Sequence, residues 1–375
     1  MTKLAVVLFN LGGPDRPQAV RPFLFNLFND PAIIGAPGPL RWLLAQAISR
    51  WRAPVAHQIY QELGGGSPLL ANTQAQAQAL EAALNGELGP DETKVFIAMR
   101  HWHPMSEAAA HAVKAYDPER VVLLPLYPQF STTTTGSSLE AWWRAAVRAG
   151  LTAPSTAICC YPRLDGLAAE VAGLLSSALG EARGHGVPRV LFSAHGLPKK
   201  IVARGDPYQW QVEQTAAAVL EALAEPELDW RICYQSRVGP LEWIGPSTDA
   251  EIVRAGSDRV PVVVVPIAFV SEHSETLVEL DIEYRRLAER SGVPDYIRVP
   301  TVAAGTAFIA GLAALVHAVL EKPRPLCSQA GGRICPARWT GCPLETARDG
   351  ATLGGRQSAG RQKTGQGQSH GRVPG

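Results

Sequence analysis

The chain lacks an uninterrupted apolar segment of about 20 residues, so no membrane-spanning helix is expected. Its first residues, MTKLAVVLFNLGGP, form only a short apolar run that ends in Gly-Gly-Pro. They lack the longer apolar region and the cleavage site of a secretory signal, so we expect a buried first strand there. Attachment to a membrane surface stays open.

Charge is sparse and balanced, with 35 Lys and Arg against 34 Asp and Glu and a net charge of +1. No basic block with interleaved aromatic residues occurs, so nucleic acid is not expected as a partner. Two glycine-rich stretches, NLGGP (10–14) and ELGGGSP (62–68), match neither GxGxxG nor a phosphate-binding P-loop. Nucleotide binding therefore has no support.

The six cysteines are too few for a disulfide framework in 375 residues. Without an export signal, a reducing cytoplasm is the expected compartment. Cys327, Cys335 and Cys342 lie near the end of the chain but form no CxxC pair. Two interpretations stay open: free thiols in a loose tail, or ligands of an iron–sulfur cluster, which needs a fourth ligand.

Short apolar runs are what the sequence has in abundance, and alanine-rich stretches of helical pattern lie between them. The runs cover 4–11, 94–100, 120–128, 155–161, 189–195, 230–236 and 260–269. The helical stretches include 73–84, 165–179 and 306–321. Because the runs are continuously apolar rather than alternating, they predict buried parallel strands in an α/β fold.

The runs fall into two groups, so we expect two doubly wound sheets. The first lobe is expected over 1–150 and the second over 151–325, with the helix 306–321 able to pack back on the first lobe. Residues 326–375 are expected to form a cysteine-containing extension and a tail. The tail from 350 is rich in Gly, Gln, Ser and Arg, has no acidic residue and is predicted to be disordered.

Polar clusters follow three of the predicted strands, where α/β folds bind their ligands. The cluster SAHGLP places His195 at such a strand end, where its imidazole could abstract a proton at neutral pH or could merely shape the turn. The cluster AMRHWHP places Arg100 at another, where it could bind a carboxylate or only end the strand.

The stretch SEHSETLVELDIEY (271–284) is rich in carboxylates and has no basic residue. On an α-helix Glu275, Glu279 and Glu283 would stack on one face with about 40° of drift per step, where like charges repel. A row of this kind suits a path for a divalent cation or for protons. A solvated helix face explains the charges as well, and the segment alone does not choose between them.

The region 23–51 is longer than a strand-to-helix connection needs. Apolar residues recur at helical spacing from Leu40 to Trp51, with arginines around them. This pattern is typical of an interfacial helix or an apolar lip, but pattern alone favours a core helix.

Taken together, these segments resemble the ferrochelatase family in order and across residues 4–320. The matching stretches are LGGP, YQELGGGSP, MRHWHP, YPQFSTTTTGSS, LFSAHGLPKKIVARGDPY, YQSRVGPLEWIGPSTD and PIAFVSEHSETLVELDIEY. The resemblance implies two similar Rossmann-like lobes, each a parallel sheet flanked by helices, with a porphyrin cleft between them. It implies a monomer or homodimer that inserts Fe²⁺ into a porphyrin with release of two protons.

The resemblance also assigns roles to matched positions. It makes His195 the active-site histidine, which takes a pyrrole proton or ligates iron, and places Glu275 on the opposite side of the macrocycle. It places Glu279 and Glu283 along a helix widened into a π-turn. The resemblance thus implies four metal ligands: His195, Glu275, Glu279 and Glu283. Porphyrin contacts are implied for Leu11, Tyr60, Ser67, Arg100, His101 and Trp243.

Two departures concern the metal and the cluster. Leu11 stands where some members have methionine, and His101 where many have tyrosine, both beside the metal side of the pocket. Some members bind a [2Fe–2S] cluster through three C-terminal cysteines and an internal one. Here Arg338 occupies the place of the second cysteine of the family's CPxC pair, and the internal position falls at Glu170, although Cys159 and Cys160 lie nearby.

The substrates expected from the resemblance are protoporphyrin IX and Fe²⁺, and no cofactor is expected to be required. A [2Fe–2S] cluster at Cys327, Cys335 and Cys342 stays open beside free thiols. The apolar region 23–52 favours protoporphyrin and a peripheral membrane contact. Alternatives are a coproporphyrin III ferrochelatase, another tetrapyrrole chelatase such as a cobalt chelatase, and a non-enzymatic haem-binding protein. That protein would not require both His195 and Glu275.

Overall fold

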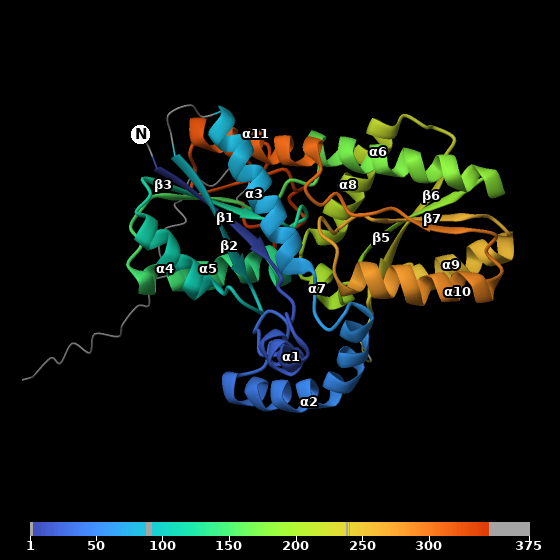
Figure 1. Ribbon diagram of the computed structural model, residues 1–375, viewed down its shortest axis with the longest axis horizontal. Helices are drawn as coiled ribbons and strands as arrows, with labels where there is room; N and C mark the ends of the chain where they lie inside the picture. The colour runs from blue at the N-terminus through green and yellow to red at the C-terminus, as the bar shows by residue number, and fades with distance from the viewer. Residues whose placement is uncertain (1–2, 88–91, 238, 240, 345–375) are drawn as a thin grey trace, which may run out of the picture.

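The computed structural model describes residues 3–87, 92–237, 239 and 241–344. Two parallel sheets lie side by side, and helices cover both faces of each (Figure 1). The first sheet has the order β2-β1-β3-β4-β9. Its strands are β1 (Lys3–Asn10), β2 (Glu92–Met99), β3 (Arg120–Pro125), β4 (Ser155–Ile158) and β9 (Leu326–Cys327).

The second sheet repeats the plan of the first with the order β6-β5-β7-β8. Its strands are β5 (Arg189–His195), β6 (Asp229–Gln235), β7 (Val262–Pro266) and β8 (Tyr296–Arg298). All of the described strand pairs in both sheets are parallel. The α/β fold with two similar lobes is thus confirmed, and each of the seven predicted strands is present.

Alternate residues of one strand serve two different cores. In β1, Leu4, Val6 and Leu8 face one hydrophobic cluster and Ala5, Val7 and Phe9 face another. Because both faces are buried, the strand reads as a continuous apolar run.

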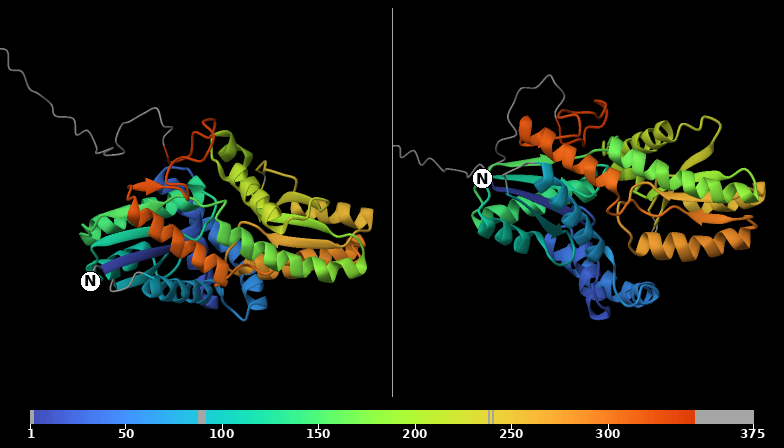
Figure 2. Two further views of the ribbon diagram at one scale, coloured as in Figure 1. Left: turned by 90° about the horizontal axis from the view of Figure 1, so that it is seen from above. Right: turned by 45° about the horizontal axis from the view of Figure 1, so that its top comes forward.

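Helices cover each face in pairs (Figure 2). In the first lobe α3 (Leu69–Glu87) and α11 (Thr306–Glu321) pack on one face, and α4 (Ser106–Tyr116) and α5 (Ser137–Ala149) on the other. In the second lobe α6 (Asp165–Ala182) and α8 (Tyr208–Leu223) oppose α9 (Thr248–Asp258) and α10 (Arg285–Ser291). The remaining short helices are η1 (Pro17–Ala19), η2 (Thr132–Gly136), η3 (Arg183–His185), α7 (Lys199–Ala203) and η4 (Glu275–Tyr284).

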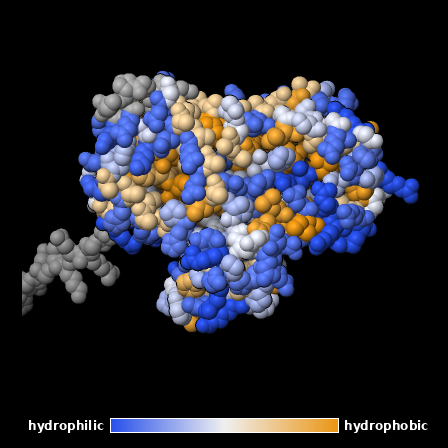
Figure 3. Space-filling view, viewed as in Figure 1, coloured by the Kyte–Doolittle hydropathy of each residue, from blue (hydrophilic) through white to orange (hydrophobic). Residues whose placement is uncertain are grey.

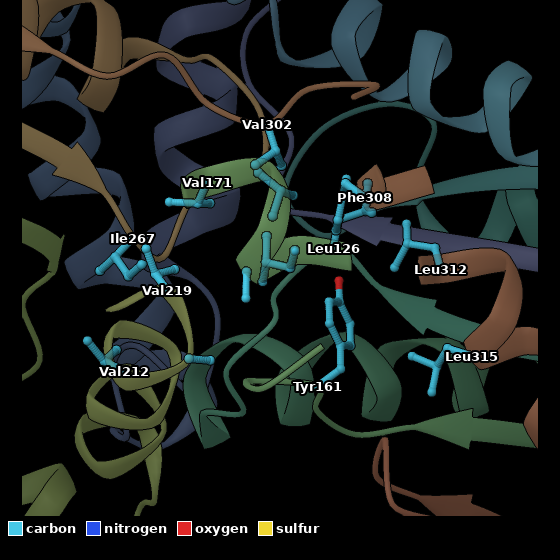
Figure 4. Close-up of a cluster of buried hydrophobic side chains, with 14 of the residues drawn as sticks. Leu126, Tyr161, Val171, Val212, Val219, Ile267, Val302, Phe308, Leu312 and Leu315 are labelled. Carbon is cyan, nitrogen blue, oxygen red and sulfur yellow. The ribbon is translucent and has the colours of Figure 1, made fainter. Parts of the chain in front are cut away.

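The largest core is shared by the two lobes. Figure 4 shows Leu126 and Tyr161, which follow strands of the first sheet, near Val302 and Phe308. Helix α11 contacts both α3 and α6 and so packs against both lobes. This continuous core fixes the relative position of the two sheets, and with it the strand ends that each contributes.

The boundary expected at residue 150 differs from this arrangement. Strand β4 lies beyond it, yet β4 pairs with β3 in the first sheet. Strand β9 then returns to the same sheet after the whole second lobe, pairing Cys327 with Ile158. The first lobe is therefore built from two separate parts of the chain. The tail predicted to be disordered from residue 350 lies outside the described residues.

Two helices project below the lobes and form the lip, defined here as residues 20–62 (Figure 1). They are α1 (Val20–Phe28) and α2 (Gly38–Glu62), and Phe23 and Leu24 of α1 pack against Trp102 of the first lobe. One side of α2 stays exposed, with relative exposures of 58% for Leu43 and 78% for Trp51. Apolar and polar side chains mix on the face of this projection seen in Figure 3. A core helix, favoured by pattern alone, is therefore not what forms here. Among the described residues, no helix is long and apolar enough to cross a bilayer.

Candidate active site

The imidazole of His195 and the carboxylate of Glu275 meet between the carboxyl end of β5 and the start of η4. His195 Nδ1 lies 2.8 Å from Glu275 Oε2, and the side chains keep 40% and 25% of their exposure. The carbonyl of His195 accepts a hydrogen bond from the hydroxyl of Tyr208 at 3.0 Å. The histidine therefore ends a buried strand with its ring still accessible, as the sequence predicted for a functional group.

This contact differs from the expected position of Glu275 on the opposite side of a macrocycle. A flat ring between the two side chains would need about 7 Å, two carbon contact distances, and they are within hydrogen-bonding distance. In this arrangement no flat ring fits between the two side chains.

A second carboxylate, Glu279, is held beside the first. Its oxygens accept hydrogen bonds from the backbone N–H of Ser236 at 2.8 Å and from Gln235 Nε2 at 3.1 Å. The Ser236 hydroxyl contacts Glu279 Oε2 at 2.5 Å and Glu275 Oε2 at 3.3 Å. Tyr284 donates to Glu279 Oε1 at 3.1 Å. The two carboxylates and the imidazole thus form one connected polar group.

Ser236 adopts a left-handed backbone conformation, with φ of 60°. Such values are uncommon for residues other than glycine and concentrate at functional sites. The conformation turns both the N–H and the hydroxyl of Ser236 toward Glu279. The sequence analysis included Ser236 in the predicted strand 230–236 and in a matching motif but gave it no role, and its place at the end of that strand was the available signal.

The charges of this group shift the pKa of each member. Enclosure by protein disfavours the imidazolium of His195, but the charge and hydrogen bond of Glu275 outweigh it and raise the pKa above 6.5. Burial likewise opposes ionisation of Glu275, yet His195 and then His273 lower its pKa well below 4.5. The pKa of Glu279 is raised by burial and by the charge of Glu275. The resting site therefore favours imidazolium beside a carboxylate.

The helix that carries the acidic residues is a π-helix over Glu275–Tyr284. The α-helical stacking predicted from four-residue spacing is therefore wrong, whereas the widened helix implied by the resemblance is present. Glu283 is exposed, and no described hydrogen bond or ion pair links it to Glu275 or Glu279. The structure brings together only three of the four expected metal ligands.

Two acidic residues left without a role by the sequence are bound by one arginine. Arg298 pairs with both Glu272 and Asp281 at 2.6 and 2.7 Å. The carboxylates of 271–284 therefore fall into two groups. Glu275 and Glu279 belong to the site, whereas Glu272 and Asp281 bind Arg298. The arginine lies in β8, a strand that sequence reasoning did not predict.

Tyr60 and Trp243 approach the group from opposite lobes. Tyr60, near the end of α2, forms a hydrogen bond with Ser274. Burial of the Tyr60 side chain raises the pKa of its hydroxyl to about 12. Trp243 lies against Gly196, the residue after His195, where a Cβ would be 3.3 Å from the indole ring. Both residues therefore belong to the surroundings of the His195–Glu275 pair.

Leu11 and Ser67 lie together at the carboxyl end of β1. Leu11 accepts a backbone hydrogen bond from His101 at 2.9 Å, and Ser67 donates its N–H to Pro14 at 2.7 Å. A Cβ on Gly13 would be 2.6 Å from Ser67, so glycine is needed there for the two loops to approach.

Arg100 and His101 differ from their expected porphyrin contacts. Arg100 binds Asp30 of the lip at 2.8 Å and Ser137 at 2.7 Å, so its guanidinium is already engaged by protein. His101 is 1% exposed, and burial lowers its pKa to about 3. Both residues therefore fasten the lip to the first lobe, because Asn26 of α1 also donates to the carbonyl of His101.

The cysteines gather where the C-terminal segment returns to the first lobe. Cys159 and Cys160 have their sulfur atoms 3.4 Å apart, and Cys335 is hydrogen-bonded to Cys342. Cys327 is close enough to interact electrostatically with Cys159 and Cys160. The internal cysteines that lie near the C-terminal ones are thus Cys159 and Cys160.

Glu170, the internal position suggested by the resemblance, is engaged elsewhere. Its carboxylate accepts a hydrogen bond from the N–H of Ala307 in α11 at 2.9 Å. Within the described ranges, no three histidine, cysteine or acidic side chains are arranged to hold a single metal ion.

Three comparisons relate this chain to known proteins. The family model named Ferrochelatase matches residues 3–320. A ferrochelatase of Caulobacter vibrioides is 54% identical over 93% of this chain and 99% of its own length. A ferrochelatase of Hyphomonas neptunium is 49% identical over 96% of this chain and 99% of its own.

A solved structure described as SirB from Bacillus subtilis with Fe³⁺ is 13% identical, with a TM-score of 0.49 over 86% of this chain and 98% of that one. A likeness at that level carries no argument about function.

Proposed function

The chain belongs to the ferrochelatase family, and we propose that it inserts Fe²⁺ into protoporphyrin IX to form protohaem. Membership makes it a metal chelatase, a lyase of haem biosynthesis. The observation that carries the assignment of the site is the hydrogen bond of 2.8 Å between His195 and Glu275. It joins a base and a carboxylate at the carboxyl ends of the second sheet, where this fold binds ligands.

Metallation has to remove two N–H protons from the macrocycle and strip water from a divalent ion. His195 first releases the proton of its resting imidazolium to solvent, and the neutral imidazole then takes the two pyrrole protons one after the other and passes each to solvent. The carboxylate of Glu275 attracts Fe²⁺ and supplies an oxygen ligand. Since no flat ring fits between the two side chains, the macrocycle lies against one side of the pair, and its own nitrogens complete the iron's ligands. Glu279, held by Ser236, adds negative charge next to Glu275.

The lip supports protoporphyrin IX as the substrate. Its exposed apolar residues lie around Trp42, Leu43 and Trp51 and suit a poorly soluble ligand taken from a membrane surface. A coproporphyrin III ferrochelatase is the alternative, and a chelatase for another tetrapyrrole follows it. A non-enzymatic haem-binding protein ranks last, because it would not need His195 and Glu275 in contact.

One assay separates these functions. Purified protein receives Fe²⁺, Co²⁺ or Zn²⁺ anaerobically with protoporphyrin IX or coproporphyrin III, and metalloporphyrin absorbance is followed. We expect protoporphyrin with Fe²⁺ to be metallated efficiently. Metallation of coproporphyrin III but not of protoporphyrin IX would support a coproporphyrin III ferrochelatase. If neither porphyrin is metallated, a non-enzymatic haem-binding protein is supported instead.

The lip also supports a peripheral contact with a cytoplasmic membrane surface. Residues 31–61 contain Arg41, Arg50 and Arg52 and no acidic residue, so α2 carries positive charge along with its exposed apolar residues. Apolar side chains that enter the interface and basic ones that meet anionic headgroups are the two contributions to such binding.

The gathered thiols support a [2Fe–2S] cluster, the cofactor that the family resemblance implies. Such a cluster takes four thiolates, two for each iron. Cys335 and Cys342 would hold the cluster together with Cys327 and either Cys159 or Cys160. The fit rests on their proximity and on Cys342, whose pKa the hydrogen bond from Cys335 lowers to about 7. When bound, the cluster would supply one-electron redox chemistry.

Iron content and visible absorption of anaerobically prepared protein test the cluster. Cys335→Ser should abolish both signals, whereas Cys233→Ser should not, because Cys233 lies buried in β6 and is bonded to Thr248. Colourless wild-type protein without bound iron would contradict the proposal of a cluster.

A further inference from the structure

The π-helix η4 is long for its kind, covering the ten residues Glu275–Tyr284. Widened helical turns occur mostly as single bulges within α-helices, frequently at functional sites. A longer one needs contacts outside its own backbone to keep its shape. On one side it is held by His195 and Ser236 through the carboxylates of the site.

On the other side η4 is held by one guanidinium. Arg298 donates from Nε and Nη2 to the two oxygens of Asp281 at 2.9 and 2.7 Å, and from Nη1 to Glu272 at 2.6 Å. The side chain of Arg298 is 9% exposed, which protects these bonds from water. Such a planar fork fixes direction as well as distance.

The two carboxylates bracket the acidic residues of the site along the chain. Glu272 precedes Glu275 by three residues, and Asp281 follows Glu279 by two. Glu272 is itself fixed, because Thr301 donates its N–H to the same carboxylate oxygen at 2.9 Å. A shift of the arginine would therefore change the distance between the start of η4 and its later turn.

We propose that Arg298 is a positioning residue for metallation. By joining Glu272 to Asp281 it keeps η4 widened, so that Glu275 faces His195 and Glu279 faces Ser236. The inference rests on the proposed function for its kinetic consequence, but its effect on the helix can be measured without any substrate.

The same lobe offers a matched control. Arg189 also bridges two carboxylates, Asp229 at 2.8 Å and Asp258 at 2.7 Å, and its side chain is also 9% exposed. It lies at the first residue of β5, whereas His195 lies at the last. At about 3.3 Å per residue, the strand separates the two by roughly 20 Å.

Arg298→Lys and Arg189→Lys should be compared with wild type, since lysine keeps the charge but cannot form two parallel bonds. For Arg298→Lys we expect faster amide hydrogen exchange in 275–284 and a kcat with Fe²⁺ lower by about 10- to 100-fold, as expected of misplaced groups. The KM for porphyrin should stay within about twofold. Arg189→Lys should leave exchange in 275–284 and kcat unchanged.

Asp281→Asn provides a second variant, because it neutralises the partner rather than the arginine. Like Arg298→Lys, it should make amide hydrogen exchange in 275–284 faster and kcat lower. Unchanged kcat in both variants overturns the proposal, even if exchange is faster. Equal losses in Arg298→Lys and Arg189→Lys overturn it too. If wild-type protein metallates no porphyrin, the proposed function fails, and exchange in 275–284 alone decides the role of Arg298 in the helix.

Discussion

The hydrogen bond between His195 and Glu275 makes the site sensitive to pH. The pair is complete only where the imidazole is protonated and the carboxylate ionised. Its contribution to stability is therefore fully present below the ordinary imidazole pKa of 6.5 and is lost as pH rises through the raised pKa of His195. It is also lost as pH falls through the lowered pKa of Glu275.

Titration of His195 in histidine-labelled protein by NMR checks this coupling. We expect a pKa above 6.5 in wild type and a lower one in Glu275→Gln, because the variant removes the negative charge that favours the imidazolium. His185→Gln, on the short helix η3, identifies an unrelated resonance as a control. A His195 pKa that does not fall in Glu275→Gln would contradict the contact.

The acidic residues of η4 should differ sharply in importance. Glu279 accepts bonds from Ser236, Gln235 and Tyr284, whereas Glu283 is exposed. Glu279→Gln should therefore lower kcat about tenfold or more, equivalent to ~1.4 kcal/mol of transition-state stabilisation.

Glu283→Gln is the matched variant for that comparison. It should keep kcat within about twofold of wild type, as surface substitutions usually have small effects. Steady-state metallation of porphyrin measures both. An equal loss of kcat in the two variants would show that Glu283 contributes to metallation as much as Glu279, and would contradict this prediction.

Single residues also show where sequence reasoning stops. His195 and Glu275 could be predicted because a strand end and a carboxylate-rich stretch are local signals. Arg298 could not, because its partners Glu272 and Asp281 lie 26 and 17 residues away in the chain. Arg100 was assigned to the ligand because a strand-end arginine does not reveal a buried aspartate 70 positions earlier.

At the scale of elements, the lip is the part most open to test. The double variant Trp42→Ser/Leu43→Ser should weaken binding to vesicles that contain anionic lipid, because it removes two exposed apolar side chains of α2. Vesicle co-sedimentation measures this. Binding equal to that of wild type would contradict a membrane contact through the lip.

Val147→Ser controls for the loss of any exposed apolar residue. Val147 is 80% exposed but lies on α5, away from the lip. Its replacement should leave vesicle binding unchanged. High salt should weaken wild-type binding as well, because the arginines of α2 contribute through charge.

Helices and strands could be predicted where a local sequence pattern determines their structure. Seven apolar runs gave the longer strands, and periodic spacing gave α3, α6 and α11. The strand β9 has only two residues and exists because β4 offers an edge. The widened form of η4 depends on contacts from β6 and β8, so the spacing of its carboxylates alone predicted an α-helix instead.

At the scale of the molecule, hydrogen bonds from α3 fasten the first lobe to the loop before η4. Gln76 is fully buried, donates to the carbonyls of Val270 and Ala303 at 2.9 Å, and accepts from Ser271 at 2.9 Å. Gln76→Leu should reduce the free energy of unfolding by ~3 kcal/mol, because it leaves buried carbonyls without partners.

Gln78→Leu, an exposed position on the same helix, should change that free energy by less than about 0.5 kcal/mol. Urea unfolding followed by fluorescence measures both variants. Similar midpoints for the two would show that the hydrogen bonds of Gln76 do not hold the lobes together.

The role of His195 as the base in metallation is best measured with the variant His195→Ala. Anaerobic protein is mixed with Fe²⁺ and excess protoporphyrin IX, and protohaem formation is followed by absorbance while porphyrin binding is measured separately by fluorescence. We expect porphyrin binding close to that of wild type and a kcat lower by at least about 100-fold, the contribution of a general base. Full turnover by His195→Ala would contradict this role.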